Sequence, residues 1–276
     1  MKIIRSFLAA AITLSLVAGF GGVQMKKSVF VEAKEKKIKI KAASDFTLKL
    51  PSNWKNGYVM KKSKKIKHGS YVAFYSKKCH RQTKAGWLFT IMRYKDDSYT
   101  DMPSYELVGK WNGYSYVALF PTDVQTEGAA KSAKKQYNKL NVGALKAAAS
   151  IQPIKKKMKK GTYHVDDFSL MIPKSWKKNY TVERSKTKKK KDSYVAFYSK
   201  KCHKQTKAGW LFSIGRYTDE SYTDLPAYEL VGKWKGVNYV AIFPTDVQSE
   251  GATKAAVKQY QKLSKSAEKV ARSIMP

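Results

Sequence analysis

Two Cys-His pairs, Cys79-His80 and Cys202-His203, contain the only cysteines in the chain and are the residues best suited to chemistry. A thiol beside an imidazole can act as a nucleophile with its base or supply metal ligands. Adjacent residues on a strand point to opposite faces, which argues against a nucleophile–base pair. The spacing also matches no familiar zinc motif, so we expect no metal and no cofactor. A Cys79–Cys202 disulfide and two free thiols both stay open for an exported protein.

Carboxylates are the other candidates for catalysis, and Asp101, Glu106, Asp123 and Glu127 are the best placed of them in the first half of the chain. Nothing in their spacing sets two carboxylates across a cleft. The chain has no glycine-rich phosphate loop and no nucleophile elbow. We therefore favour a protein that is not an enzyme. The alternative is an envelope-associated hydrolase or enzyme accessory with one acidic cleft in each half.

An internal duplication organises these residues. Ser70–Tyr137 aligns with Ser193–Tyr260 without a gap, and 53 of the 68 positions are identical. A period of about 123 residues is the length of a domain rather than of a solenoid repeat. The predicted boundaries are 1–33 for a signal peptide, 34–42 for a basic arm, 43–153 for repeat one, 154–164 for a lysine-rich linker and 165–276 for repeat two.

The N-terminus has the features of a secretory signal. Lys2 and Arg5 precede an apolar run, and Val31 and Ala33 supply small residues for a cleavage site. The alternative is an uncleaved N-terminal anchor. No later run approaches the length of a membrane span, so the mature chain is expected to lack one. These features predict a secreted protein.

Each repeat opens with alternating apolar residues, Phe46-x-Leu48-x-Leu50 in repeat one, which predict a strand. A Pro and a Trp follow, and we expect Trp54 and Trp176 to fold back as plugs over the sheet. Asn112-Gly113 predicts a tight hairpin. A final apolar stripe predicts an amphipathic helix, broken near Gly143 in repeat one. Strands first and a covering helix last indicate an α+β fold with a mostly antiparallel sheet.

These motifs carry two resemblances. The opening strand, the sheet and the terminal helix resemble the α/β/α sandwich of PsbP/Mog1-like domains. The series GWLF(S/T)I-x-RY, YELVGKW and FPTDVQ is similar to an uncharacterised secreted domain of Gram-positive gut bacteria, which implies two tandem copies of that domain. Neither family supplies catalytic residues to transfer to this chain.

Charge is the strongest functional signal. The formal net charge is +35, and only six of the 55 basic residues are arginine. Lysine is a hydrated point charge that suits diffuse attraction to an anionic surface. The residues expected to bind a polyanion are Lys61, Lys62, Lys64, Lys65, Lys67, Lys155, Lys156, Lys157, Lys159, Lys160, Lys186, Lys188, Lys189, Lys190 and Lys191. Expected partners are teichoic acid, anionic lipid, acidic glycan or nucleic acid, at the cell envelope of a Gram-positive bacterium. Solvated lysine-rich loops without a partner are the alternative.

Two further residue pairs have a functional and a structural interpretation. Trp111 and Trp234 stand at hairpin tips, where they either belong to a core face or stack on a sugar or base. Arg93 and Arg216 end an apolar strand face. They either form an ion pair, with Asp123 and Asp246 as the expected partners, or capture a ligand anion.

The duplication predicts that each repeat folds alone, because each has its own opening strand, hairpin and terminal helix. Fragments 43–153 and 165–276, expressed separately, should each melt in one cooperative transition. If neither fragment shows such a transition, the repeats depend on a shared core.

Overall fold

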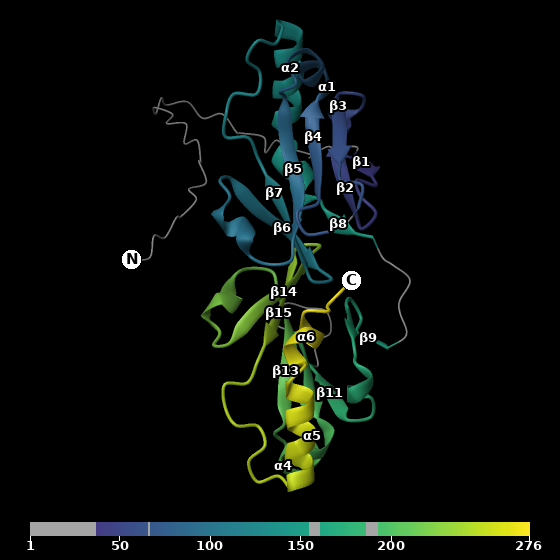
Figure 1. Ribbon diagram of the computed structural model, residues 1–276, viewed down its shortest axis with the longest axis vertical. Coiled ribbons are helices and arrows are strands. Elements are labelled where there is room, and N and C mark those ends of the chain that lie inside the picture. Colours follow the sequence, from purple (N-terminus) through teal and green to yellow (C-terminus); the bar gives the residue numbers. More distant parts are fainter. Residues whose placement is uncertain (1–36, 66, 155–160, 186–192) are drawn as a thin grey trace, which may run out of the picture. The chain divides into compact units, whose positions relative to one another are not determined.

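The chain is a mixed α/β structure in which every strand pairing found among the described residues is antiparallel (Figure 1). The computed structural model describes residues 37–65, 67–154, 161–185 and 193–276. The described residues belong to one compact unit, Glu35–Pro276.

Repeat one contributes eight strands and three helices. The strands are β1 (Lys37–Ile40), β2 (Phe46–Pro51), β3 (Tyr58–Lys62), β4 (Tyr71–Ser76), β5 (Trp87–Tyr94), β6 (Tyr105–Trp111), β7 (Tyr114–Leu119) and β8 (Gln152–Pro153). The helices are α1 (Lys77–Thr83), α2 (Lys131–Asn141) and α3 (Ala144–Ala149), with 3₁₀ turns η1 (Ser52–Trp54) and η2 (Ser98–Asp101).

Repeat two follows the same order. Its strands are β9 (Thr162–His164), β10 (Ser169–Met171), β11 (Tyr180–Arg184), β12 (Tyr194–Ser199), β13 (Trp210–Tyr217), β14 (Tyr228–Trp234) and β15 (Val237–Ile242). Its helices are α4 (Lys200–Thr206), α5 (Lys254–Ser264) and α6 (Ala267–Ala271), with 3₁₀ turns η3 (Lys174–Trp176) and η4 (Ser221–Asp224).

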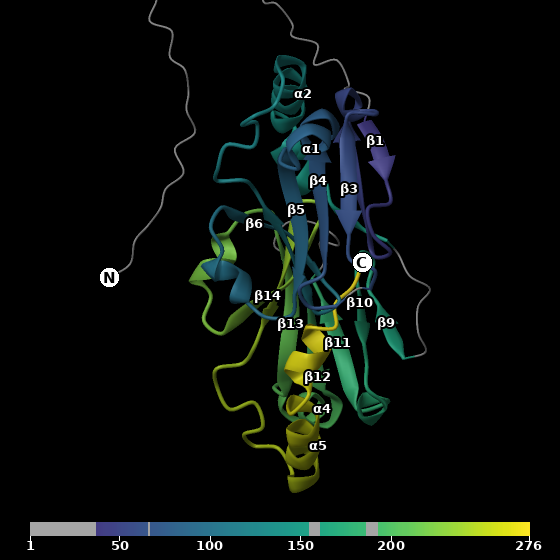
Figure 2. The ribbon, with the colours of Figure 1, turned by 45° about the horizontal axis from the view of Figure 1, so that its top comes forward.

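The segments interpreted from the sequence as a basic arm and a linker both contribute strands. Lys37–Ile40 of the arm forms β1 and pairs with β2, which also pairs with β8. Thr162–His164 of the linker forms β9 and pairs with β10 (Figure 2). Ile38 and Ile40 pack against the core, so the alternation of lysine and isoleucine marks a half-buried strand rather than a free arm.

The main sheets of the two repeats join into one sheet of ten strands, in the order β11-β12-β13-β15-β14-β6-β7-β5-β4-β3. The junction pairs β6 with β14, and Lys110 faces its own counterpart, Lys233. Equivalent residues opposed on antiparallel strands are related by a local two-fold axis. The turn of repeat one also contacts the end of repeat two, where the Asn112 N–H donates to the Ile274 carbonyl at 2.8 Å.

The hairpin and the terminal helix form as predicted. Asn112 and Gly113 have positive φ angles of 53° and 69°, as the tight turn requires. The predicted helix of repeat one is divided between α2 and α3 at Val142 and Gly143. Repeat two is divided at the same place, between α5 and α6, although it has no glycine there.

The predicted plugs are confirmed as core residues, because Trp54 and Trp176 are both 0% exposed. Their indole N–H groups differ. Trp176 Nε1 donates to Ser266 Oγ at 2.9 Å. Gly143 stands where repeat two has Ser266, and Trp54 Nε1 has no hydrogen-bond partner among the described residues. A β-carbon on Gly143 would lie 3.3 Å from that nitrogen.

Removing the Ser266 hydroxyl should therefore destabilise repeat two. Ser266→Ala leaves a second buried indole N–H unpaired, which costs about 1–3 kcal/mol. Urea unfolding measures this, with Ser264→Ala as the control because Ser264 bonds only a helix carbonyl, that of Gln261. Equal stabilities for Ser266→Ala and the unaltered protein would contradict the role assigned to this bond.

Candidate anion-binding site

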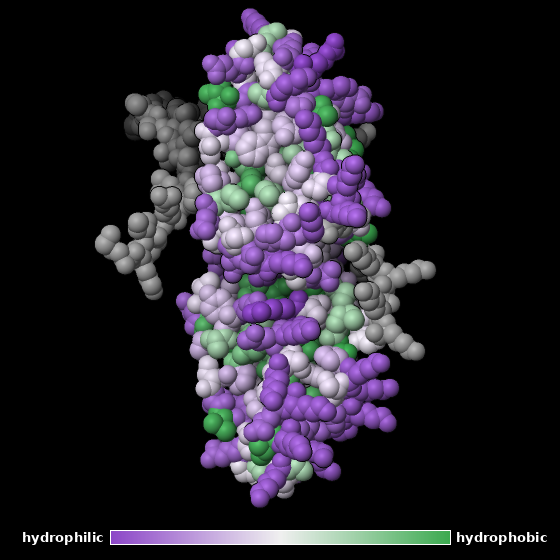
Figure 3. Space-filling view, in the orientation of Figure 1, coloured by the Kyte–Doolittle hydropathy of each residue, from purple (hydrophilic) through white to green (hydrophobic). Residues whose placement is uncertain are grey.

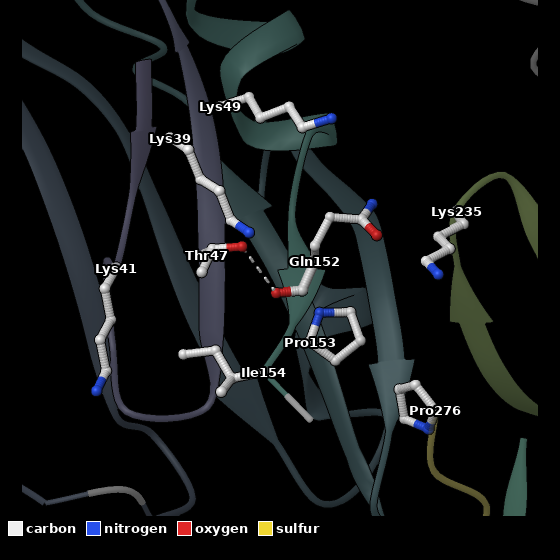
Figure 4. A pocket seen from close by; sticks show the side chains of 9 residues that line it. All are labelled: Lys39, Lys41, Thr47, Lys49, Gln152, Pro153, Ile154, Lys235 and Pro276. Atoms are coloured by element: carbon white, nitrogen blue, oxygen red, sulfur yellow. Dashed lines mark hydrogen bonds between the residues drawn. The ribbon is translucent and has the colours of Figure 1, made fainter. Parts of the chain in front are cut away.

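A groove of about 770 Å³ lies where β1, β2 and β8 meet the turn between β14 and β15 (Figure 4). Nine residues line it: Lys39, Lys41, Thr47, Lys49, Gln152, Pro153, Ile154, Lys235 and Pro276. Four of these are lysines, and none has a carboxylate side chain. The groove therefore presents only positive side-chain charge.

The pairing of β1 with β2 brings the lysines together. Lys39 lies directly opposite Lys49 in the ladder. Lys41 is two residues from Lys39 and so shares its face, while Ile38 and Ile40 pack against the core on the other face. Like charges directly opposite across a sheet are destabilising unless something neutralises them. A bound anion would remove that repulsion.

Repeat two completes the groove through Lys235. This residue has a positive φ of 54° in the turn between β14 and β15, where repeat one has Asn112. Figure 4 shows its side chain across the groove from Gln152. The groove therefore draws on residues separated by almost the whole length of the described chain.

In the described part of the chain, Lys39, Lys41, Lys49 and Lys235 take part in no ion pair. The ion pairs that are present use the guanidinium groups of Arg93, Arg216 and Arg272 and the imidazoles of His68 and His203. The positive charge of the groove is thus available to a partner.

A second lysine-rich hollow, of about 280 Å³, lies between η1, α1 and α2. Its four lysines are Lys55, Lys78, Lys135 and Lys139, and each has a lysine counterpart in repeat two: Lys177, Lys201, Lys258 and Lys262. The face of the molecule seen in Figure 3 is largely hydrophilic, in keeping with this charge.

The lysine tracts predicted from the sequence are only partly described. Lys61, Lys62, Lys64, Lys65 and Lys67 are exposed at the end of β3 and in the loop that follows. The tracts Lys155–Lys160 and Lys186–Lys191 lie outside the described residues. The first of these continues directly from Ile154, which lines the groove. Sequence reasoning missed the groove itself, although alternating lysines at 37, 39 and 41 were the signal for a basic strand face.

Arg93 and Arg216 form buried ion pairs, but the predicted partners, Asp123 and Asp246, are wrong. Arg93 donates to both carboxylate oxygens of Asp45, with Nε–Oδ2 and Nη2–Oδ1 distances of 3.0 and 2.9 Å. Tyr116 adds a hydrogen bond to Asp45 Oδ2 at 2.7 Å. Asp123 is instead exposed and accepts a bond from its neighbour Gln125.

Repeat two builds the same cluster from Asp167, Arg216 and Tyr239. Burial alone raises the pKa of Asp167, but the hydrogen bonds and charge of Arg216, with the bond from Tyr239, outweigh it and lower the pKa below 3.8. Burial, with the charge of Asp167 beside it, raises the pKa of Tyr239. Arg216 is therefore matched internally and is not presented to a ligand.

Of the two alternatives left open for the cysteines, the structure has free thiols, because Cys79 and Cys202 are both buried and unbridged. Each thiol contacts its own repeat, Cys79 Sγ lying 3.2 Å from the Ala133 carbonyl and Cys202 Sγ 3.2 Å from that of Ala256. The Cys-His pairs lie on the short helices α1 and α4 rather than on strands. Burial raises the pKa of both thiols, which opposes a thiolate nucleophile.

Trp111 and Trp234 are core residues, which confirms the core-face interpretation over stacking on a ligand. They are 4% and 3% exposed. Each lies flat against the tyrosine of its own cluster, with ring centroids 3.8 Å apart for Trp111–Tyr116 and 4.0 Å for Trp234–Tyr239. Gly109 makes room for Trp111, since a β-carbon there would lie 2.3 Å from the indole.

No acidic cleft emerges from the candidate catalytic carboxylates. Asp101, Glu106, Asp123 and Glu127 are all exposed, and none lines the groove or the lysine hollow. Among the described residues no group of three or more His, Cys, Asp or Glu side chains is placed to hold a metal ion. The described helices are all too short or too polar to cross a membrane.

Comparison of the chain with protein-family models, with curated proteins and with solved structures found no match.

The buried cluster of repeat two predicts a specific pH dependence. Because the pKa of Asp167 is lowered on folding, its contribution to stability is full above pH 3.8 and is lost as pH falls through the folded pKa. Asp167→Asn, which leaves the Arg216 charge buried and unpaired, should cost about 3 kcal/mol at neutral pH. The difference from the unaltered protein should shrink in acid. Asp166→Asn, at the exposed neighbouring position, is the control, and a difference that did not shrink in acid would contradict the assignment.

Proposed function

We propose that the protein is a secreted, non-enzymatic protein that attaches to an anionic polymer of the cell envelope through the lysine groove. The observation that supports this most directly is the opposition of Lys39 and Lys49 across β1 and β2, with Lys41 and Lys235 alongside and no acidic side chain in the lining. The four ammonium groups around the groove repel one another. This repulsion destabilises the free protein and favours binding of a polyanion.

The kind of charge favours a flexible polymer over a sequence-specific ligand. Lysine attracts phosphate as a point charge and lacks the planar fork with which arginine reads carboxylates or bases. Wall teichoic acid, with its repeated phosphates, is the polymer that we favour. Anionic lipid, acidic glycans and nucleic acid share part of this chemistry and serve as comparison partners.

We further propose that the repeats are two tandem domains of one fold, which resembles the PsbP/Mog1 type. The matching element order supports this. The four lysines of the hollow have counterparts in repeat two, whereas the groove needs residues from both repeats. A long polymer could contact these lysines and the groove together, and several weak contacts on one chain would raise the overall affinity.

Neutralising the groove should weaken binding more than neutralising other lysines. The variant Lys39→Gln/Lys49→Gln/Lys235→Gln removes three charges from the groove, and the matched control Lys200→Gln/Lys204→Gln/Lys254→Gln removes three exposed charges on α4 and α5. Affinity for purified teichoic acid should fall with salt, and the groove variant should flatten that dependence. For duplex DNA, the slope of log K against log salt would become shallower by up to about 2–3, because each neutralised phosphate contributes about 0.9 to that slope.

Two outcomes would count against the proposal. Equal losses in the two triple variants would show that diffuse charge, not the groove, does the binding. Salt-independent affinity would show that charge is not the basis of attachment. Thermal melting checks that both variants stay folded, since surface charges contribute little to stability.

A further inference from the structure

A third hollow, chemically different from the two lysine-lined sites, lies on repeat two. It measures about 290 Å³ and is formed by residues of β12, β13 and β15. Tyr194, Tyr198, Trp210 and Tyr217 supply aromatic rings, and Ser213 and Gly215 lie among them. Side chains alternate along β12, so Tyr194 and Tyr198 lie on one face of the sheet. Val195 and Phe197 lie on the other face and are buried in the core. The hollow therefore opens on the face of the sheet that points away from the core.

The lining of this hollow contains no charged residue. This is unusual in a chain with 55 lysines and arginines among 276 residues. Because its lining carries no positive charge, this hollow does not attract the anionic ligands proposed for the lysine groove. The rings offer apolar faces, while the Tyr194 hydroxyl, the Trp210 N–H and the Ser213 hydroxyl offer hydrogen bonds.

Gly215 lies in this hollow with the Tyr217 ring packed against it. Repeat one has Met92 at the same place, one of only 15 differences among the 68 aligned positions (68 − 53 = 15). Met92 fills the equivalent space, since its Sδ accepts a hydrogen bond from Tyr94 at 3.4 Å and Tyr94 is only 4% exposed. A β-carbon on Gly215 would come within 2.7 Å of the Tyr217 ring.

Two other differences from repeat one change the polar contacts around the hollow. Trp87 Nε1 donates to Thr90 Oγ1 at 2.8 Å in repeat one, whereas the described part of repeat two has no such bond from Trp210. Lys61 Nζ lies 5.4 Å from the ring centre of Tyr75 in repeat one. Its counterpart is Glu183, an acceptor that bonds His203 Nε2 at 3.0 Å near Tyr198.

We propose that this aromatic hollow, on repeat two alone, binds a neutral pyranose unit of a glycan. A pyranose has an apolar C–H face that packs on aromatic rings and a rim of hydroxyl groups that need donors and acceptors. The volume is at the small end of ligand pockets in proteins, about 300 Å³, and suits one sugar ring better than a larger ligand. Tyr194, which is 45% exposed, provides the most accessible ring. The inference goes beyond the proposed attachment to a polyanion and does not depend on it.

The test is calorimetric titration of the full chain with two neutral oligosaccharides, cellotriose and tri-N-acetylchitotriose. Binding of at least one, with one site per chain and little dependence on salt, is expected. Tyr194→Ala removes the exposed ring and should weaken binding about tenfold or more, as loss of a stacking partner does elsewhere. Gly215→Met installs the residue of repeat one and should weaken binding at least as much.

The matched control is Tyr71→Ala, which removes the equivalent exposed ring of repeat one and should leave affinity unchanged. Thermal melting of each variant separates loss of binding from loss of folding. No binding of either sugar at millimolar concentration would overturn the proposal, as would affinity that Gly215→Met leaves unchanged. The lysine-groove variant should bind the sugars normally, so failure here and failure of polyanion attachment are distinguishable.

Discussion

A buried guanidinium group in each repeat joins three segments that are far apart in the sequence. Arg93 on β5 is 2% exposed and pairs with Asp45, which precedes β2, while Tyr116 on β7 completes the cluster. Phe46 packs beneath, with its ring centre 5.3 Å from the guanidinium carbon. A buried charge is tolerable only with a matched partner, so the cluster fixes the start of β2 against the main sheet. Because β2 pairs with β1, the lysines of the groove depend on this anchor for their position.

The duplication explains both the regularity of the structure and its differences. The β6–β14 junction opposes equivalent residues, Lys110 and Lys233, and extends each main sheet into the other. Joining these strands removes two sheet edges that would otherwise attract other chains. The groove lies beside this junction and exists once. The aromatic hollow lies instead within repeat two, where Gly215 replaces the Met92 of repeat one.

The lysine groove and the aromatic hollow differ in chemistry. The groove is lined by four lysines and no acidic side chain, and the hollow by aromatic rings and no charged side chain. An envelope polymer can offer both phosphate charge and sugar rings, so the two proposals are compatible on one protein. Each rests on different residues: the groove draws on both repeats, and the aromatic hollow lies on repeat two alone.

The sequence by itself determined the features that local pattern controls. The duplication, the opening strands, the Asn112-Gly113 turn and the terminal helix follow from periodicity and backbone preference. The break in that helix recurs in repeat two without a glycine, so Gly143 alone does not account for it. The burial of Trp54 and Trp176 follows from a bulky ring after a strand-ending proline. These properties depend on neighbours a few residues away, so the sequence is enough to predict them.

Only the tertiary structure decided which distant residues meet. Asp45, rather than Asp123, reaches Arg93 because the opening strand packs beside β5 and β7, and no sequence spacing encodes that contact. The thiols are separate because each is buried beneath the helices of its own repeat. The segment that contains Lys39 is a strand because β2 offers it a partner, and Lys235 joins it through the turn of the other repeat. A site assembled across repeats depends on packing between elements, whereas charge and periodicity specify only what each element can contribute.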